Sequence, residues 1–168
     1  MQIKEFQLQI LPYKNRLFRT ANQVLRNTPE AEDVVQEVFI KLWNKRADLV
    51  GIENLEAWSV RVTKNLAIDK LRSRPVPSSP IEESWSVESE NADPYEQIES
   101  NDTMGHIQKL MSRLPEKQRL VMHLRDIEEY SYQEISEVLE IPMAQVKVYL
   151  FRARQSMRNW IEQTQLAH

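Results

Sequence analysis

The chain has 168 residues, of which 41% are hydrophobic, and a formal net charge of −3 at pH 7. This length fits one or two domains with modest cores. The chain has no cysteine and only two glycines, which excludes disulfides, thiolate metal sites and glycine-rich phosphate loops. The first twenty residues lack a long apolar run, so we expect neither a signal peptide nor a membrane span there.

Charge is distributed unevenly along the chain. Residues 1–74 carry +4, residues 75–105 carry −8, and residues 106–168 carry +1. Four of the eight prolines fall in residues 72–102, together with many serines and few large apolar residues. Such a composition buries too little surface to offset the entropy of ordering. The sequence therefore predicts two domains, residues 1–74 and 103–168, joined by a flexible acidic linker over residues 75–102.

The first domain is predicted to be a bundle of three or four helices. A helical stretch spans about Lys4–Arg26 and is broken or started at Pro12. Thr28 is the predicted cap of the next helix, with Pro29 at its first position. Asn54 is the predicted cap of a helix that stops before Pro75. The apolar face predicted for that helix consists of Leu55, Trp58, Val62 and Leu66.

The second domain is predicted to contain several short helices and a longer last one. A helix opens at Asp102 or Thr103, and another starts at Leu114-Pro115-Glu116. Ser131 and Glu134 form a capping box for a short helix ending near Leu139. After Pro142 the last helix buries a stripe of Val146, Leu150, Ala153 and Met157.

The last helix also concentrates positive charge. It carries Lys147, Arg152, Arg154 and Arg158 and has no acidic residue between Pro142 and Arg158, although the whole chain is acidic. These cations lie off the apolar stripe and are expected to face outward. A cationic helix after helix-turn-helix spacing indicates binding to duplex DNA.

Two sequence blocks resemble one known family. The segments LPEKQRLVMHLRDIEEYSYQEISEVLEIP and AQVKVYLFRAR resemble the C-terminal domain of bacterial RNA polymerase sigma factors. The segments EAEDVVQEVFIKLWNKR and NLEAWSVRVTKNLAIDKLRSR resemble the second conserved domain of the same family. Two such blocks joined by a short linker are similar to the extracytoplasmic-function (ECF) group. The resemblance implies an all-α fold of two small helical domains, the C-terminal one with a helix-turn-helix.

The resemblance also implies three sets of functional residues. Positions that would dock on core polymerase are Asp33, Gln36, Glu37, Phe39, Ile40, Leu42 and Trp43. Positions that would grip and melt the −10 promoter element are Trp58, Arg61, Lys64, Asn65, Asp69, Lys70 and Arg72, together with the loop 51–54. Positions that would read the −35 element in the major groove are Lys147, Val148, Tyr149, Phe151, Arg152 and Arg154. Arginine and lysine suit guanine edges, whereas apolar side chains suit thymine methyl groups.

The implied partners are core RNA polymerase, through its β′ coiled coil and β flap, and promoter DNA. An anti-sigma factor, often membrane-bound in this family, is a further implied partner, and the expected location is the cytoplasm. No catalytic residue, cofactor, metal or small-molecule substrate is predicted, because the chain has no HExxH, GxSxG or Walker motif.

The chain departs from the family pattern at a few positions. Family members often have glycine where this chain has Glu129, Glu140 and Ala144. A left-handed backbone is expected near Glu140, at the turn of the helix-turn-helix. Val148 and Tyr149 stand where smaller polar or basic residues are common, which leaves the −35 sequence open.

Two alternatives to a sigma factor follow from the residues alone. The first is a stand-alone helix-turn-helix regulator, such as the output half of a response regulator. A receiver domain would need alternating strands and helices, whereas residues 1–74 have a helical pattern. The second is an interaction protein whose basic helix binds another protein. Binding to random duplex DNA across a salt series distinguishes that case.

Overall fold

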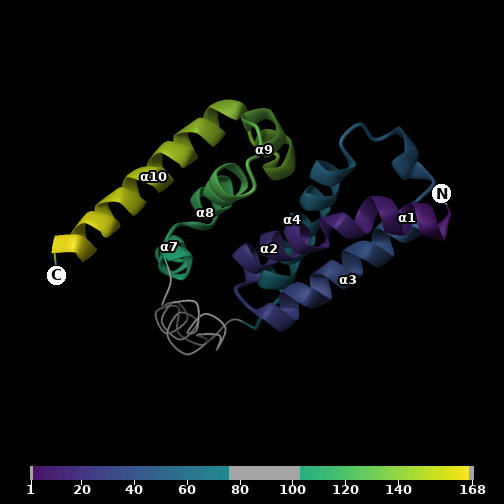
Figure 1. Ribbon diagram of the computed structural model, residues 1–168, viewed down its shortest axis with the longest axis horizontal. Coiled ribbons are helices and arrows are strands. Elements are labelled where there is room, and N and C mark those ends of the chain that lie inside the picture. Colours follow the sequence, from purple (N-terminus) through teal and green to yellow (C-terminus); the bar gives the residue numbers. More distant parts are fainter. Residues whose placement is uncertain (1, 76–102, 167–168) are drawn as a thin grey trace.

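The computed structural model describes residues 2–75 and 103–166 of the chain, and Figure 1 shows helices throughout both ranges. Apart from Pro75, the predicted linker lies outside the described residues. The all-α prediction is confirmed, and neither range contains a β-strand. The elements of the N-terminal part are α1 (Ile3–Ile10), the 3-10 turn η1 (Leu11–Tyr13), α2 (Lys14–Leu25), α3 (Thr28–Asn44), the 3-10 turn η2 (Asp48–Gly51) and α4 (Leu55–Arg72).

The C-terminal part, residues 103–166, places a long last helix across three short ones (Figure 1). Its elements are α7 (Thr103–Met111), α8 (Glu116–Met122), the single π-helical turn η3 (His123–Ile127), α9 (Tyr132–Leu139) and α10 (Met143–Leu166). α9 and α10 form the predicted helix-turn-helix. The apolar stripe predicted for the last helix is confirmed, because Val146, Leu150, Ala153 and Met157 are all buried.

Most helix ends follow from local sequence. Asn54 Oδ1 accepts a hydrogen bond from the backbone N–H of Ala57 at 3.0 Å, which confirms it as the cap of α4. The capping box of α9 is also confirmed, with reciprocal bonds between Ser131 and Glu134. The prediction that Thr28 caps α3 is wrong by one residue. Asn27 is the cap, because its backbone is extended and its Oδ1 accepts from the Glu30 N–H at 2.9 Å.

The buried face of α4 differs from the predicted one. Leu55, Trp58, Val62 and Leu66 are only half-buried, whereas the fully buried positions are Ala57, Ser59, Val60, Thr63, Lys64 and Ala67. α4 packs against α2 and α3 on one side and α9 on the other, so it is enclosed around much of its circumference. Small residues allow the neighbouring backbones to approach. The hydroxyls of Ser59 and Thr63 donate within the helix, to the carbonyls of Leu55 and Ser59.

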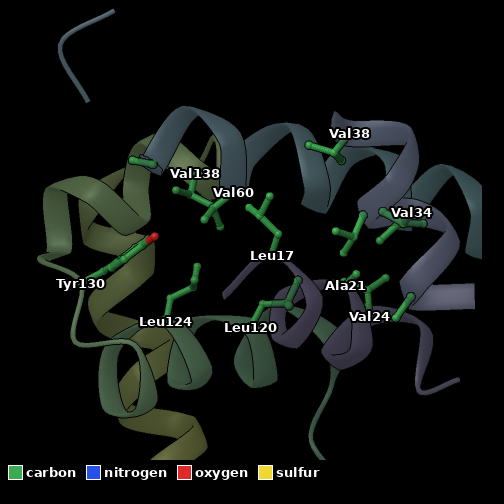
Figure 2. Packing of buried hydrophobic residues seen from close by; sticks show 14 of the residues in the cluster. Leu17, Ala21, Val24, Val34, Val38, Val60, Leu120, Leu124, Tyr130 and Val138 are labelled. Atoms are coloured by element: carbon green, nitrogen blue, oxygen red, sulfur yellow. The ribbon is translucent and has the colours of Figure 1, made fainter. Parts of the chain in front are cut away.

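The two parts of the chain share one hydrophobic core. Figure 2 shows Leu17 and Val60 of the N-terminal part close to Leu124 and Val138 of the C-terminal part. Leu17, Val60 and Leu124 are completely excluded from solvent. A smaller cluster of Leu110, Met111, Leu114, Ala153 and Met157 lies within the C-terminal part alone. The two parts are therefore packed against each other.

Three non-glycine residues of the described ranges adopt a left-handed backbone: Arg26 (φ 52°), Glu129 (φ 63°) and Glu140 (φ 59°). The left-handed residue expected at the helix-turn-helix turn is thus confirmed at Glu140. Each such residue costs about 1–2 kcal/mol of strain relative to a right-handed one. Arg26 and Glu140 both use their side chains to reach the other part of the chain, Arg26 by donating to the carbonyl of Ser112 at 3.2 Å.

Candidate nucleic-acid interface

The outward face of α10 is cationic and partly apolar. The side chains of Lys147, Arg152, Arg154 and Arg158 are all exposed, as predicted. Phe151 is 68% exposed and Val148 45%, whereas Tyr149 is half-buried against the core. A helix of this kind can approach a duplex because it offers phosphate-binding cations beside apolar atoms that fit thymine methyl groups.

Two of the α10 cations are held in place by neighbouring elements. Arg154 donates from Nε and Nη2 to the two carboxylate oxygens of Asp126 in η3, at 3.1 and 2.5 Å. This hydrogen bonding raises the pKa of the Arg154 guanidinium. Lys147 Nζ lies 5.8 Å from the centroid of the Tyr132 ring, and the Arg125 guanidinium lies 4.5 Å from it. Arg152 has no ion-pair partner within the described ranges, so its fork is free for a ligand.

The predicted −10 residues lie along α4. Arg61, Asn65, Asp69 and Arg72 are exposed, and Trp58 is half-buried against the core. Lys70 is half-buried, and its Nζ lies 3.8 Å from a carboxylate oxygen of Asp33 on α3. Lys64 is only 5% exposed, and burial lowers the pKa of its ammonium group. The exposed members form a mixed polar and cationic strip.

Side chains of the C-terminal part contact one end of this strip. Arg61 Nε donates to Glu140 Oε1 at 2.5 Å, and Asn65 Nδ2 lies 3.5 Å from the same oxygen. In the loop before α4, Asn54 Nδ2 donates to Glu134 of α9 at 3.0 Å. A cleft between α4, α8 and α9 is lined by residues of both parts, including Lys64, Arg72 and Lys117. The predicted −10 surface therefore faces the helix-turn-helix in this conformation.

The predicted polymerase-docking residues lie on α3 and differ in exposure. Asp33, Gln36, Glu37 and Ile40 are exposed, Phe39 and Trp43 are half-buried, and Leu42 is completely buried. Trp43 packs edge-to-face on Phe6 of α1 at 5.2 Å, with the Arg46 guanidinium 3.9 Å from its ring. A groove beside them is lined by Leu11, Phe18, Val35, Gln36 and Phe39. Leu42 belongs to the core and is not available to a partner.

A buried ionic network at the boundary was not found by sequence reasoning. The Glu128 side chain is 1% exposed and accepts from Arg16 Nε at 3.0 Å and from Arg19 Nε and Nη2 at 2.8 Å. His123 Nε2 lies 3.0 Å from its other oxygen. Burial would raise the pKa of the Glu128 carboxyl, but the hydrogen bonds from Arg19 and His123 outweigh it and hold that pKa well below its usual range. Arg16 and Arg19 belong to α2, so the network joins the two parts.

Tyr130 and Arg119 also reinforce this boundary. Tyr130 Oη donates to Glu56 of α4 at 3.2 Å, and Arg16 lies 5.5 Å from the Tyr130 ring. Arg119 of α8 is 6% exposed and donates to the carbonyls of Leu114 and Gln23, each at 2.9 Å. Burial lowers the pKa of Arg119 to about 10. Charged groups enclosed in this way need their partners, so the two parts are docked specifically.

Family models match both parts of the chain. The Sigma-70 region 2 model matches residues 10–75, and the Sigma-70, region 4 model matches residues 105–157. The chain is 28% identical to the ECF RNA polymerase sigma factor SigW of Bacillus subtilis, over 87% of this chain and 83% of SigW. It is also 28% identical to the ECF RNA polymerase sigma-E factor of Escherichia coli K12, over 95% of this chain and 87% of that protein.

Solved structures show the same fold. The sigma factor RpoE of Bartonella quintana, solved with the anti-sigma factor NepR, superposes with a TM-score of 0.73 at 18% identity, over 95% of this chain and 98% of that one. CnrH, solved with the cytosolic domain of CnrY, gives a TM-score of 0.71 at 19% identity, over 96% of this chain and 90% of that one. These likenesses cover both helical parts.

An all-α fold with a cationic helix-turn-helix and matches to two sigma-70 regions defines a transcription initiation factor of the sigma-70 type. The region 2 match favours this class over a stand-alone regulator, which has no need of that region. The chain belongs to the ECF group of RNA polymerase sigma factors. Sigma factors as a class are not enzymes. Among the described residues, no helix combines the length and apolarity needed to cross a bilayer, and no group of three acidic or histidine side chains is placed to hold a metal.

The Glu128 network generates a prediction about stability. We expect Glu128→Gln to reduce the free energy of unfolding by about 3 kcal/mol at neutral pH, because it removes the charge that pairs with Arg16 and Arg19. The native pKa of Glu128 is depressed, so its contribution is fully present above the unfolded value of about 4.3 and is lost as the pH falls below it. Urea unfolding from neutral pH to about pH 3 measures the difference.

The control for this series is Glu129→Gln, at the exposed neighbouring position. We expect it to change the free energy of unfolding by less than about 0.5 kcal/mol. A Glu128→Gln deficit that stays constant down to pH 3 would show that the native carboxylate is not specially stabilised.

Proposed function

We propose that this ECF sigma factor binds core RNA polymerase through α3 and holds the promoter at two points, with α4 at the −10 element and α10 at the −35 element. In this proposal residues 1–74 act as sigma domain two and residues 103–168 as sigma domain four. The observation that carries the proposal is the cationic outward face of α10, which has no carboxylate between Pro142 and Arg158 in an acidic chain and follows a short helix at helix-turn-helix spacing. Matches to sigma regions on both parts support it.

At the −35 element, we assign different DNA contacts to Arg152, which is unpaired among the described residues, and to Arg154, which is bonded to Asp126. Arg152 is exposed and unpaired within the described ranges, so its fork can bond guanine O6 and N7. Arg154 already uses two N–H groups on Asp126, so its remaining donors suit a phosphate. Phe151 and Val148 offer apolar surface to thymine methyl groups. Lys147, beside the Tyr132 ring, and Tyr149 complete the proposed set.

At the −10 element, the chemistry required is to capture unstacked bases and their phosphates. Arg61, Asn65 and Arg72 are exposed donors on α4, and Trp58 adds an aromatic surface for stacking. Lys64 is too buried to reach DNA while the two parts are docked. Asp69 and Lys70 lie further along the helix and complete the proposed set. Binding a melted strand here requires the C-terminal part to move away.

At core polymerase, α3 offers an acidic and apolar face. Asp33, Gln36, Glu37 and Ile40 are available to the polymerase, and Phe39 and Trp43 in part. Leu42 holds the helix in the core and supports this face from behind. We propose the β′ coiled coil as the ligand of this face and the β flap as a contact of the C-terminal part.

The setting of the protein follows from the same proposal. The chain would act in the cytoplasm, where core polymerase and promoters are found. One solved structure with this fold is a complex with the anti-sigma factor NepR, and another is a complex with the cytosolic domain of CnrY. An anti-sigma factor is therefore the regulator we propose for this chain. No cofactor or small-molecule substrate enters the proposal.

The −35 assignment is tested by Lys147→Ala combined with Arg152→Ala. We expect run-off transcription by core polymerase, from the promoter upstream of the chain's own gene, to fall at least tenfold, since each lost base contact is worth about 1–3 kcal/mol. Because Arg152 is assigned to a base edge, the slope of log promoter affinity against log salt should decrease by at most about one, from the loss of Lys147. Binding to core polymerase should persist.

The matched control is Lys109→Ala combined with Arg113→Ala, which removes the same charges from exposed positions outside α10. Equal loss of transcription in this control would mean that general charge, not the α10 face, supports promoter binding. Loss of core binding together with transcription in the α10 variant would assign the helix a role in folding.

The docking assignment is tested by Ile40→Asp. Ile40 is 61% exposed, so the substitution should leave the melting temperature unchanged. We expect affinity for core polymerase to fall at least tenfold, because a charge would replace apolar surface that the polymerase buries. Met104→Asp on α7, at a residue 55% exposed, is the matched control and should bind normally. Normal binding by a folded Ile40→Asp variant would place the docking surface elsewhere.

A further inference from the structure

The strip of α4 assigned to the −10 element already has a ligand in this structure. Glu140, the last residue before the helix-turn-helix turn, places a carboxylate oxygen 2.5 Å from Arg61 Nε and 3.5 Å from Asn65 Nδ2. Lys64 also contributes favourably to the charge on Glu140 and helps to lower the pKa of that carboxyl, after the hydrogen bonds from Arg61 and Asn65. Three of the residues proposed to grip DNA thus surround one acidic side chain.

The backbone at Glu140 supports a role beyond the turn itself. Its φ of 59° and ψ of 44° lie in the left-handed region, where glycine carries no strain and other residues do. The backbone N–H of Glu140 caps α9 by donating to the carbonyl of Ser136, whereas the hydrogen-bond partners of its side chain are in the N-terminal part. A strained residue whose side chain reaches a functional surface is a candidate for a functional role.

A carboxylate and a DNA phosphate are both anions that accept hydrogen bonds from the same kinds of donor. Arginine binds either group through its N–H fork, and the amide of Asn65 can donate to either oxygen. Glu140 and promoter phosphate therefore compete for one site. The competition is direct, because the oxygen of Glu140 occupies the position in front of Arg61 that a phosphate oxygen would take.

Geometry excludes simultaneous occupation of both promoter elements by the docked chain. The −35 and −10 elements are separated by about 25 base pairs, or roughly 85 Å along B-form DNA. In this structure α10 begins three residues after Glu140, whose side chain touches α4. The helix-turn-helix that carries the proposed −35 surface is thus held against α4, and the chain must open to span a promoter.

We propose that Glu140 is an intramolecular ligand of the −10 surface, a carboxylate that stands in for promoter phosphate and keeps the free chain closed. The inference rests on the proposed assignment of α4 to the −10 element. Binding of core polymerase separates the two parts and frees Arg61, Lys64 and Asn65 from Glu140 only when a promoter can be engaged. Free sigma factor is thereby restrained from holding nucleic acid unproductively.

The Arg61–Glu140 pair is one of several contacts at the boundary. Both side chains are partly exposed, at 46% and 44%, so the pair biases the closed state only modestly. The shared core and the buried Glu128 network supply the rest. Loss of Glu140 should therefore loosen the closed state by a few-fold and leave the two parts able to dock.

The chain offers a matched pair of variants for the test. Glu140→Gly removes the carboxylate and relieves the left-handed strain, so it should not impair folding of the turn. Glu129→Gly removes the same charge and the same kind of strain at φ 63°, from an exposed residue with no contact to α4. Both are made in the Lys147→Ala/Arg152→Ala background, which weakens binding by α10 and leaves α4 as the main nucleic-acid surface.

The measurement is the affinity of each free variant for a fluorescent oligothymidine strand, by anisotropy. We expect Glu140→Gly to bind about two- to five-fold more tightly than its parent and Glu129→Gly to bind like the parent. Equal affinities for the two glycine variants overturn the proposal. Run-off transcription by the native chain with core polymerase is measured alongside. Absence of transcription contradicts the proposed function, whereas normal transcription with equal strand affinities contradicts the Glu140 inference alone.

Discussion

The rest of the structure depends on the packing of the two helical parts against each other. Leu17 and Val60 from one part and Leu124 and Val138 from the other exclude water from a common core (Figure 2). A buried apolar side chain of this size contributes about 1.5–3 kcal/mol, so several together favour docking strongly. Glu128 adds specificity, since its charge is satisfied only when α2 brings Arg16 and Arg19 to it.

This packing places α4 between the N-terminal bundle and α9, although α4 also carries the surface proposed to bind DNA. One face holds the N-terminal bundle together through Ala57, Thr63 and Ala67, and another meets α9. The strip that remains carries Arg61 and Asn65, and it is the strip proposed for promoter contact. The energy that stabilises the free chain therefore opposes its function. In the proposed function, core polymerase supplies the binding energy that separates the parts, and the proposed docking face of α3 is exposed in the docked chain.

Local sequence predicted local structure well. The caps at Asn54 and Ser131, the break at Pro12 and the outward cations of α10 depend on neighbours within a turn or two, which periodicity and capping rules capture. The left-handed turn at Glu140 followed from the family pattern. Even the misplaced cap at Thr28 was an error of one residue between two good capping types.

The docking of the two parts could not be predicted in this way. Arg19 and Glu128 are 109 positions apart, and no periodicity connects them. Read locally, Glu128 is a loop acid, Lys64 a helix-surface cation and Leu42 a docking residue, yet all three are buried in the docked chain. Glu128 is buried where the two parts meet, whereas Leu42 is buried where α3 packs against α2 and α4. The functional residue assignments remain proposals. The resemblance to sigma factors identifies which positions correspond, but it does not give the burial or the contacts of the side chains there.

The most direct test of the account is the distance between the two parts in solution. The chain has no cysteine, so Lys45→Cys on the N-terminal part and Gln163→Cys on α10 can carry a single pair of spin labels at exposed positions. Pulsed electron resonance is recorded for the free chain and for its complex with core polymerase and promoter. The account predicts one narrow, short distance in the free chain and a much longer one in the complex. A broad, long distribution in the free chain, or an unchanged short distance in the complex, would contradict it.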